Sequence, residues 1–246
     1  MPGFEIINKA ENKEVNSIFK DGNGVLFRQG FENIRKNSYK VKTFEEKFRK
    51  KFKSKYSLAV TSGTSALRVA LACKNIGHGD EVITQSFTFV ATVEAIVESG
   101  AKPICTEIDD TLNMCPKDLE KKINKKTKAV IVVHMLGTGA NLSEIIKICK
   151  KYNLILIEDT AWGIGAKYKN KFLGNVGDIG TYSFDFAKSL TTGEGGMLVF
   201  QNKKNFLAAK AWHDHGHENN PNYPRWEDTR SSSGFNFRMS ELQGAV

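Results

Sequence analysis

Beyond residue 56, short apolar runs alternate along the chain with longer segments whose apolar residues recur at helical spacing. The pattern predicts strands within 56–63, 80–85, 101–108, 127–135 and 154–159, and helices within 64–76, 87–100 and 142–153. Strands that alternate with helices of ten or more residues favour βαβ units. The strand runs "AVIVV" and "LILI" are almost continuously apolar, as in strands that are covered on both faces. The predicted fold class is therefore α/β, with a mainly parallel sheet sandwiched by helices.

The region before these strands is rich in lysine. Residues 44–55 have helical spacing, and Phe44, Phe48 and Phe52 lie four residues apart on one face. This pattern predicts an amphipathic helix with a charged outer face. We therefore divide the chain into an N-terminal arm and helix, residues 1–56, and a large domain, residues 57–246.

The last thirty residues predict a loop and the start of a helix. Residues 217–234 are polar and contain proline, which is typical of a long loop. Ser240 and Gln243 form the pattern of a capping box at a helix start. The chain ends at Val246, well short of the roughly 12 residues that a marginal isolated helix needs. We expect from this that the chain is truncated at its C-terminus.

Composition is that of a globular domain. The chain has 246 residues, 40% of them hydrophobic, enough for one large domain with its own core. The N-terminus turns polar too early for a signal peptide, and no apolar run approaches the roughly 20 residues that span a membrane. The cysteines lack CxxC spacing, which predicts buried, reduced thiols in a cytoplasmic protein. They are Cys73, Cys105, Cys115 and Cys149.

The net charge of +9 raises the question of an anionic partner. A basic surface can bind nucleic acid or a membrane, but it can equally consist of scattered, solvated lysines. No helix-turn-helix, RRM or zinc-finger pattern accompanies the charge. Scattered lysines are the favoured interpretation, so neither nucleic acid nor a membrane is an expected partner.

Candidate chemistry begins directly after the first predicted strand. Residues 61–65, "TSGTS", combine small hydroxyl residues with a glycine at the expected start of a helix. A helix N-terminus offers free N–H groups and a positive dipole end, and hydroxyl donors add to them, so this segment suits a phosphate group. The Walker spacing GxxxxGK[ST] is absent. An ordinary helix cap explains one Ser or Thr but five small residues less well.

Asp159 ends the apolar strand run 154–159. A carboxylate at this position either caps the next helix or faces a ligand. Beside a heteroaromatic nitrogen it would keep that nitrogen protonated and strengthen an electron sink. The pattern leaves both alternatives open. Glu158 alternates with Asp159 along the strand and is expected to point the other way.

Lys188 lies between two segments that restrict the backbone. Ser183, Phe184 and Phe186 predict a strand before it, and the glycines of 193–196 predict a tight return loop after it. A lysine becomes a nucleophile when desolvation or a neighbouring cation lowers its pKa. Most loop lysines are solvated, but this setting suits a lysine held against a bound aldehyde.

Phe87 and Phe89 follow the predicted strand 80–85. Either ring could lie flat on the ring of a cofactor. For a single phenylalanine, packing in the core is the simpler alternative. Together these features describe a pyridoxal phosphate site: a phosphate-binding segment, an aromatic ring that can stack on the cofactor, an aspartate at a strand end and a lysine between two constrained segments.

At these residues the chain resembles the DegT/DnrJ/StrS sugar aminotransferases, which are fold-type I pyridoxal phosphate enzymes. The resemblance runs from "MPGFE" to the last residue, and the motifs keep their order and spacing. They are "TSGTSAL", "DEVITQSFTFVAT", "IEDTAWGIGAKYKNKFLGNVGDIGTYSF", "KSLTTGEGGMLV", "HDHG" and "GFNFRMSELQGA". The resemblance implies the large domain of that fold, with a sheet of the seven-stranded type, and pyridoxal 5'-phosphate as cofactor.

The resemblance assigns roles to single residues. Lys188 would form the Schiff base with the cofactor and carry the proton during amino transfer. Asp159 would pair with the pyridinium nitrogen, and Phe89 would stack on the ring. With lysine at position 188, where a minority of the family has histidine and acts as dehydratases, amino transfer is favoured.

The same resemblance places the phosphate and the partner subunit. Gly63 and Thr64 would hold the phosphate through backbone and hydroxyl groups, and Ser183 would add a donor. Asn236 resembles the residue that reaches the phosphate bound by the neighbouring subunit. The resemblance thus implies a homodimer with shared active sites.

Two features depart from the family pattern. Many members carry Gln or His three residues after the aspartate, where it contacts the phenolic oxygen of the cofactor, and this chain carries Trp162. Trp162 is therefore expected to border the cofactor or to shape the sugar pocket. Members also continue into a smaller C-terminal domain, which we expect to be missing from this chain.

The motifs "EDTAW", "SFDFAKSLTTGEGG" and "HDHGHENNP" most resemble the branch that makes 8-amino-3,8-dideoxy-octulosonate, an amino sugar of lipopolysaccharide. The resemblance implies L-glutamate as amino donor and the 8-keto form of 3-deoxy-octulosonate as acceptor. A nucleotide-linked keto sugar is the alternative acceptor, and an inactive remnant is the alternative to an enzyme.

Histidines suggest a metal site that other features do not support. His213, His215 and His217 lie two residues apart, which on a strand would put them on one face. No cysteine or carboxylate trio has matching spacing, so a loop that borders the substrate pocket is favoured and no metal is expected. His134 ends a predicted strand and either touches the pocket or is a satisfied buried histidine.

Overall fold

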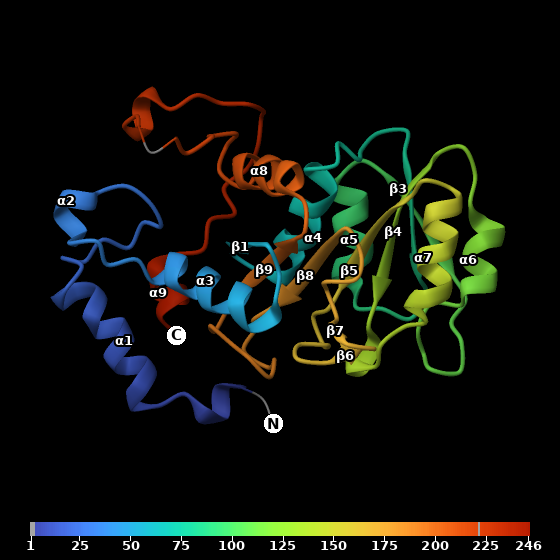
Figure 1. The fold of residues 1–246 in the computed structure, drawn as a ribbon, viewed down its shortest axis with the longest axis horizontal. Helices are drawn as coiled ribbons and strands as arrows, with labels where there is room; N and C mark the ends of the chain where they lie inside the picture. The colour runs from blue at the N-terminus through green and yellow to red at the C-terminus, as the bar shows by residue number, and fades with distance from the viewer. Residues whose placement is uncertain (1–2, 221) are drawn as a thin grey trace.

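The computed structural model describes residues 3–220 and 222–246, so Met1, Pro2 and Pro221, which fall in the predicted arm and loop, lie outside the description. Its central feature is a seven-stranded sheet in the order β1-β9-β8-β5-β4-β2-β3 (Figure 1). β9 runs antiparallel to β1 and β8, and the other neighbours pair in parallel. The strands are β1 (Tyr56–Val60), β2 (Glu81–Gln85), β3 (Lys102–Thr106), β4 (Thr127–Val133), β5 (Ile155–Asp159), β8 (Ile179–Ser183) and β9 (Gly196–Phe200).

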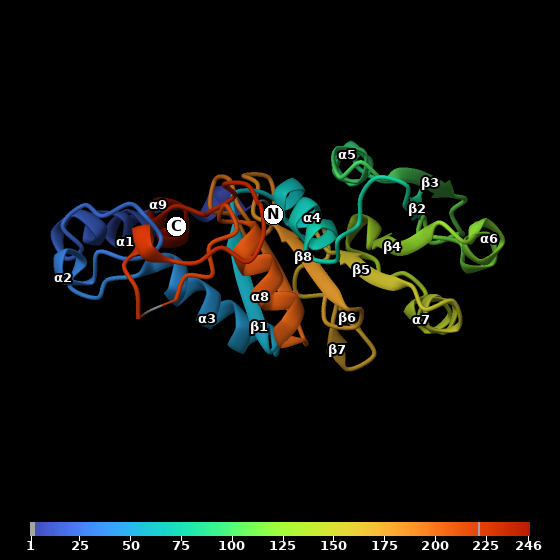
Figure 2. The ribbon, with the colours of Figure 1, turned by 90° about the horizontal axis from the view of Figure 1, so that it is seen from above.

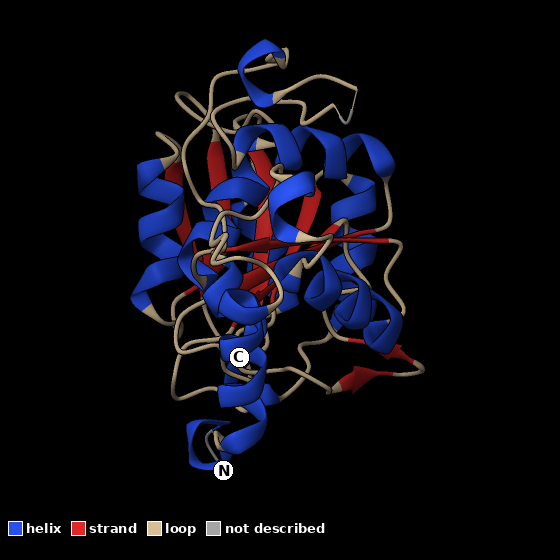
Figure 3. Cartoon of the chain, turned by 90° about the vertical axis from the view of Figure 1, so that its left-hand side faces the viewer, coloured by secondary structure: helices blue, strands red, loops and turns tan. Residues whose placement is uncertain are grey.

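Helices cover both faces of the sheet, as Figures 2 and 3 show. Strand alternation decides which helix each side chain meets. In β1, Leu58 packs in a buried cluster with residues of α4, α5 and α8, whereas Ala59 packs with residues of α3. α6 and α7 enclose a further cluster with β4 and β5. The helices are α3 (Lys40–Phe52), α4 (Gly63–Ala72), α5 (Val90–Glu98), α6 (Pro116–Lys122), α7 (Leu142–Lys151) and α8 (Lys203–Trp212). The predicted α/β sandwich is confirmed.

The N-terminal arm reaches away from the sheet and meets the C-terminal helix (Figure 1). Arg35 and Glu241 form a buried ion pair of 3.2 Å between the two segments. The arm contains η1 (Gly3–Ile6), α1 (Lys9–Lys20) and α2 (Glu32–Arg35), and the chain closes with η3 (Arg225–Glu227) and α9 (Glu241–Ala245). α9 starts with the predicted capping box between Ser240 and Gln243.

The lysine-rich helix is amphipathic, as predicted. Phe48 and Phe52 of α3 are buried, and Phe44 packs against the same cluster. The ring of Phe48 lies 5.0 Å from that of Tyr182, on β8. The apolar stripe of α3 therefore anchors the arm to the strand that precedes Lys188.

Several predicted boundaries are wrong. The strand expected to include Phe184 and Phe186 ends at Ser183, because the backbone turns where Lys188 N–H donates to the Asp185 carbonyl. The helix predicted within 87–100 begins only at Val90. The hairpin of β6 (Lys167–Tyr168) and β7 (Lys171–Phe172), the helices α1, α2, α6 and α8, and the antiparallel strand β9 were not predicted.

The prediction of buried thiols holds only in part. Cys149 is buried and Cys73 and Cys115 are half-buried, but Cys105 is exposed because β3 forms the edge of the sheet. All the cysteines are free. Within residues 3–220 and 222–246, no helix has the length and apolar character to cross a membrane.

Candidate active site

Three of the predicted site segments meet at one end of the sheet, where the parallel strands have their carboxyl ends. β1, β5 and β8 run in the same direction, so their carboxyl ends lie together, where ligands bind in open α/β sheets. Ser62 follows β1, Asp159 ends β5 and Ser183 ends β8. The fold thus brings together residues that are more than a hundred positions apart.

The start of α4 has the features of an anion site. Ser62 caps the helix, and its hydroxyl accepts from Ser65 N–H at 3.0 Å while Ser62 N–H donates to the Ser65 hydroxyl at 2.9 Å. An ordinary cap therefore explains these two serines. Gly63 and Thr64 occupy the first two helical positions, whose N–H groups have no acceptor within a helix. These N–H groups are suited to a phosphate.

Glycine is required where this loop packs against its neighbours. A Cβ on Gly63 would lie 2.7 Å from Cβ of Ser183 and 3.1 Å from its hydroxyl oxygen. A Cβ on Gly196 would lie 2.2 Å from the Ser62 carbonyl oxygen. The close approach puts the Ser183 hydroxyl beside the free end of α4, so N–H and O–H donors converge there.

We expect Gly63→Ala to weaken binding of pyridoxal phosphate about 10- to 100-fold. The new methyl group must displace Ser183 or the helix start, and one lost hydrogen bond to a charged group is worth about 1.5–3 kcal/mol. A titration of the purified chain, followed by cofactor absorbance, measures the affinity. Gly139→Ala is the control, because its Cβ would meet Leu173 at an ordinary 3.5 Å. Equal affinities for the two variants would show that the α4 start does not hold the phosphate.

Asp159 is buried and hydrogen-bonded on both oxygens. One accepts from the Thr92 hydroxyl at 3.0 Å and the other from Ala161 N–H at 3.1 Å. Burial raises the pKa of Asp159, although the two hydrogen bonds and the charge of Lys188 act in the opposite direction. Residues 160–166 form turns and no helix, so the helix-capping alternative is wrong.

Glu158 points to the opposite side of β5, as predicted. Its carboxylate pairs with Nε2 of His134 at 3.0 Å and accepts from Gly174 N–H at 2.9 Å. Nδ1 of His134 accepts from Ala140 N–H at 3.2 Å. His134 is therefore a satisfied buried histidine, and it holds the loop that follows β4.

Lys188 is half-buried beside the end of β5. Its carbonyl accepts from Gly3 N–H at 2.7 Å, and its Nζ lies 3.7 Å from the ring centroid of Trp162. Burial lowers the pKa of Lys188, while the charges of Asp185 and Asp159 raise it. The N-terminal arm thus contacts the backbone of Lys188. The local sequence pattern did not reveal this contact.

The aromatic platform is exposed. Phe89 is 68% exposed and Phe87 41%, so packing of these rings in the core is excluded. Phe89 precedes α5, and Thr92 in the first turn of that helix binds Asp159. Thr92 was missed from the sequence, although it lies inside the quoted "SFTFVAT", because one threonine in a helix gives no sign of its partner.

Asn236 belongs to a segment that lies beside the end of β1, where Thr61 N–H donates to the Phe237 carbonyl at 3.1 Å. Its side chain is exposed, and Oδ1 accepts from Arg238 N–H at 3.3 Å. Within the described part of the chain, it shares no hydrogen bond with the residues around Lys188. The described contacts therefore link Asp159 to Lys188 and Trp162, and Gly63 to Ser183, but they do not join the Asn236 side chain to these residues.

The three histidines do not lie on one face of a strand. His213 ends α8, and His215 has a left-handed backbone with φ of 53°. Nδ1 of His213 donates to the Lys210 carbonyl, and burial lowers the pKa of His213 to about 3. Among the residues that the structure describes, no group of three or more side chains is arranged to hold a metal.

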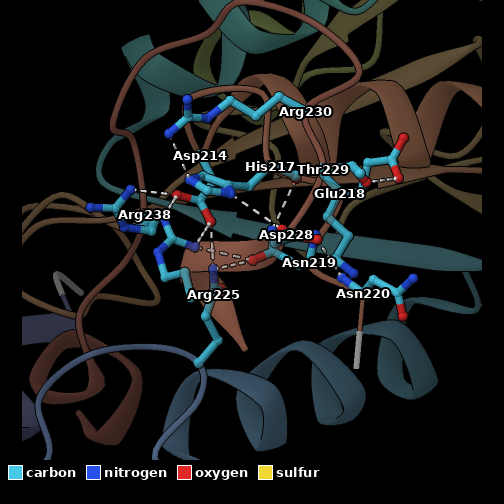
Figure 4. Close-up of polar contacts among 12 residues, drawn as sticks. Asp214, His217, Glu218, Asn219, Asn220, Arg225, Asp228, Thr229, Arg230 and Arg238 are labelled. Atoms are coloured by element: carbon cyan, nitrogen blue, oxygen red, sulfur yellow. Dashed lines mark hydrogen bonds and ion pairs between the residues drawn. The ribbon is translucent and has the colours of Figure 1, made fainter. Parts of the chain in front are cut away.

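An ionic network around Asp214 was not predicted (Figure 4). This buried carboxylate forms ion pairs with Arg225 and Arg238, and it also accepts from the Gln29 amide. The network joins the 217–234 loop to the arm and to the segment that carries Asn236. Burial raises the pKa of Asp214, but the two guanidinium groups outweigh burial and hold this pKa well below its ordinary value of 3.8.

We expect Asp214→Ala to lower the free energy of unfolding by about 3–5 kcal/mol, because it leaves two guanidinium groups without their buried partner. The folded-state pKa lies below the unfolded one, so the stabilisation by Asp214 is present above about pH 4 and is lost as the pH falls further. Urea unfolding between pH 7 and pH 3 measures both effects. Asp110→Ala, at an exposed position, should change stability by less than about 0.5 kcal/mol. If the two variants unfold alike, the network does not stabilise the fold.

Comparison with known proteins identifies the family of the chain. The profile of the DegT/DnrJ/EryC1/StrS aminotransferase family matches residues 28–246. The chain is 39% identical to a GDP-perosamine synthase of Escherichia coli O157:H7 over 207 residues, which are 84% of this chain and 56% of that protein.

Solved structures show the same architecture. An aminotransferase from Psychrobacter cryohalolentis matches with a TM-score of 0.88 at 32% identity, over 97% of this chain and 60% of that one. NtdA of Bacillus subtilis, solved with bound PMP, matches with a TM-score of 0.85 at 28% identity, over 99% of this chain and 53% of that one. The chain therefore spans between half and two thirds of these relatives. It belongs to the DegT/DnrJ/EryC1/StrS aminotransferase family, a family of fold-type I enzymes that depend on pyridoxal phosphate.

Proposed function

We propose that this chain is a sugar aminotransferase that moves an amino group from L-glutamate to a keto sugar. One observation supports this most directly: a half-buried lysine, Lys188, and a buried carboxylate, Asp159, lie at the carboxyl ends of the strands with the N-terminus of α4. An amine, a carboxylate and an anion site in that arrangement are the groups that pyridoxal phosphate requires.

The residues present fit the cofactor. The N–H groups of Gly63 and Thr64 and the Ser183 hydroxyl would hold the phosphate, and the exposed ring of Phe89 would cover the pyridine ring. Asp159 would pair with the ring nitrogen. When bound, pyridoxal phosphate supplies an electron sink for the carbon that gains or loses the amino group.

Lys188 has two tasks in this proposal. Its amine would hold the cofactor through the aldehyde group and would move a proton at the substrate carbon. Burial lowers its pKa, which increases the fraction of neutral, nucleophilic amine near pH 7. Asp159, in turn, is kept dry by burial and held in one orientation by the Thr92 hydroxyl and the Ala161 N–H.

A homodimer with shared active sites is part of the proposal. Asn236 is exposed, and it follows a loop that the Asp214 network holds in place, so it is available to a second subunit. Large apolar side chains near the site are exposed as well, which favours a covering surface. They include Phe89, Leu136, Trp162 and Phe186.

Two keto sugars are candidates for the acceptor. The motifs "EDTAW" and "HDHGHENNP" support the 8-keto form of 3-deoxy-octulosonate, a precursor of lipopolysaccharide sugar. The 39% identity to a GDP-perosamine synthase supports a nucleotide-linked keto sugar instead. The side chains that would choose between them lie around Trp162 and the 217–234 loop.

The test follows the two halves of the reaction. The purified chain is mixed with pyridoxal phosphate, and its visible absorbance is followed as L-glutamate is added. We expect the band to bleach with glutamate and to return with the correct keto sugar, so each candidate acceptor is added separately. Gel filtration of the same sample gives the oligomeric state. A folded chain that develops no band, or whose band does not respond to glutamate, would contradict the proposal.

A further inference from the structure

Trp162 is the group that the amino end of Lys188 contacts. The distance of 3.7 Å from Nζ to the ring centroid lies well inside the limit of about 6 Å for a cation–π interaction. Lys188 forms no salt bridge within 4.0 Å among the residues that the structure describes. The indole face is therefore placed to hold the ammonium group.

The backbone of Trp162 is held from two sides. Asp159 accepts from Ala161 N–H at 3.1 Å, which sets the turn that leads into Trp162. On the other side, the Trp162 carbonyl packs against Gly137, where a Cβ would lie 3.1 Å from the carbonyl oxygen. The ring itself is 47% exposed. The backbone of Trp162 is therefore fixed, while its partly exposed ring can contact groups in the active site.

We propose that Trp162 is a positioning residue for Lys188, whose indole face holds the free ammonium group beside the end of β5. The inference rests on the proposed function only in treating Lys188 as the reacting amine. The amine of Lys188 must release a proton before it can attack an aldehyde, so the cation–π contact holds the resting, protonated form.

Other charges near Lys188 come from two elements. Asp185 lies in its own turn and Asp159 ends β5, and both favour the protonated amine, whereas burial opposes it. η1 packs on the Lys188 carbonyl, and its Glu5 side chain is exposed. The indole face adds to the groups that favour the protonated form. Loss of the aromatic face at equal burial should therefore lower the pKa of Lys188 and increase its reactivity.

The test compares Trp162→Leu with Trp162→Phe in the cofactor-free chain. Both side chains are smaller than indole, so they expose Lys188 to a similar extent, and only phenylalanine keeps an aromatic face. Reaction of Lys188 with trinitrobenzenesulfonate is measured against pH by peptide mass spectrometry. We expect the midpoint of the leucine variant to lie about half a pH unit below that of the phenylalanine variant, or about threefold higher reactivity below the midpoint. Equal midpoints would overturn the proposal.

A fluorescence cycle gives a second readout. Lys188→Met removes the ammonium group, and we expect it to change tryptophan emission in the unaltered chain but not in the Trp162→Phe background. Trp226→Leu, at an 85% exposed position in η3, should leave the effect of Lys188→Met unchanged. An identical change in tryptophan emission in the unaltered chain and in the Trp162→Phe background would contradict the contact between Lys188 and Trp162. Because neither readout needs cofactor or turnover, the positioning role and the proposed aminotransferase activity can each fail without the other.

Discussion

Replacement of Lys188 by alanine is expected to reduce amino transfer by about 10⁴-fold or more and to remove the visible band that pyridoxal phosphate gives with the chain. The variant lacks the amine that binds the aldehyde and the group that moves the proton. General acid–base catalysis by one positioned side chain already contributes up to about 10⁴-fold. Glutamate-dependent amino transfer and the absorbance spectrum measure the two losses.

Lys188→Arg separates charge from nucleophilicity. Arginine keeps a positive charge that can face Trp162, but its guanidinium is not a nucleophile near neutral pH. We expect this variant to lose the band and the activity as fully as alanine does. A band that survives in either variant would show that another lysine binds the cofactor.

Asp159→Asn is expected to slow amino transfer by about 10²- to 10⁴-fold while the chain stays folded. The amide oxygen of asparagine can still accept from Ala161 N–H, and its NH2 group can donate to the Thr92 hydroxyl, but asparagine has no charge to pair with a protonated ring nitrogen. Loss of one partner of a buried ion pair costs about 3–5 kcal/mol, and each 1.36 kcal/mol in a barrier is a factor of ten. Steady-state rates with glutamate and a keto sugar measure the effect.

Asp185→Asn is the matched control, because Asp185 also acts on Lys188 but lies in the turn before it. We expect its rate to stay within about threefold of the unaltered chain, since about 1.4 kcal/mol corresponds to tenfold and Asp185, which is half-buried, forms no salt bridge with Lys188 among the described residues. Equal losses in the two variants would mean that the effect reflects the charge around Lys188 rather than the ring nitrogen.

The pKa of Asp159 gives this prediction a pH dependence. Burial raises its pKa above the ordinary 3.8, so in the cofactor-free chain the carboxylate is protonated at a higher pH than a solvated aspartate would be. Cofactor binding that needs the ionised carboxylate should therefore weaken as the pH falls, starting above the ordinary carboxyl range. The Asp159→Asn variant should lack this dependence.

Local patterns determined much of the fold in advance. The apolar runs of β4 and β5, the Phe44, Phe48 and Phe52 stripe of α3 and the capping box at Ser240 all follow from hydrophobic spacing and cap chemistry. These signals need only neighbours within a few residues. The position of the site at the carboxyl ends of the strands could also be anticipated, because the carboxyl ends of parallel strands lie together.

The candidate site was found through residue types at strand ends and through family motifs. Asp159, Lys188 and Gly63 were each chosen from their place beside a strand or a glycine, and Ser183 was chosen from the family motif. Sequence spacing left the alternative roles of Asp159 open. The turn after β5 excluded the capping role, because without a helix there is nothing for the carboxylate to cap.

The tertiary structure alone decided which side chains touch. Thr92 meets Asp159 across 67 positions, and Asp214 meets Gln29 across 185. Such pairs depend on strand order and on the packing of loops, which no local period encodes. The same reason explains the exposure of Cys105, because only the strand order places β3 at the edge. The sequence by itself determined which elements form and which residues have reactive chemistry, and the folded chain determined which of those residues act together.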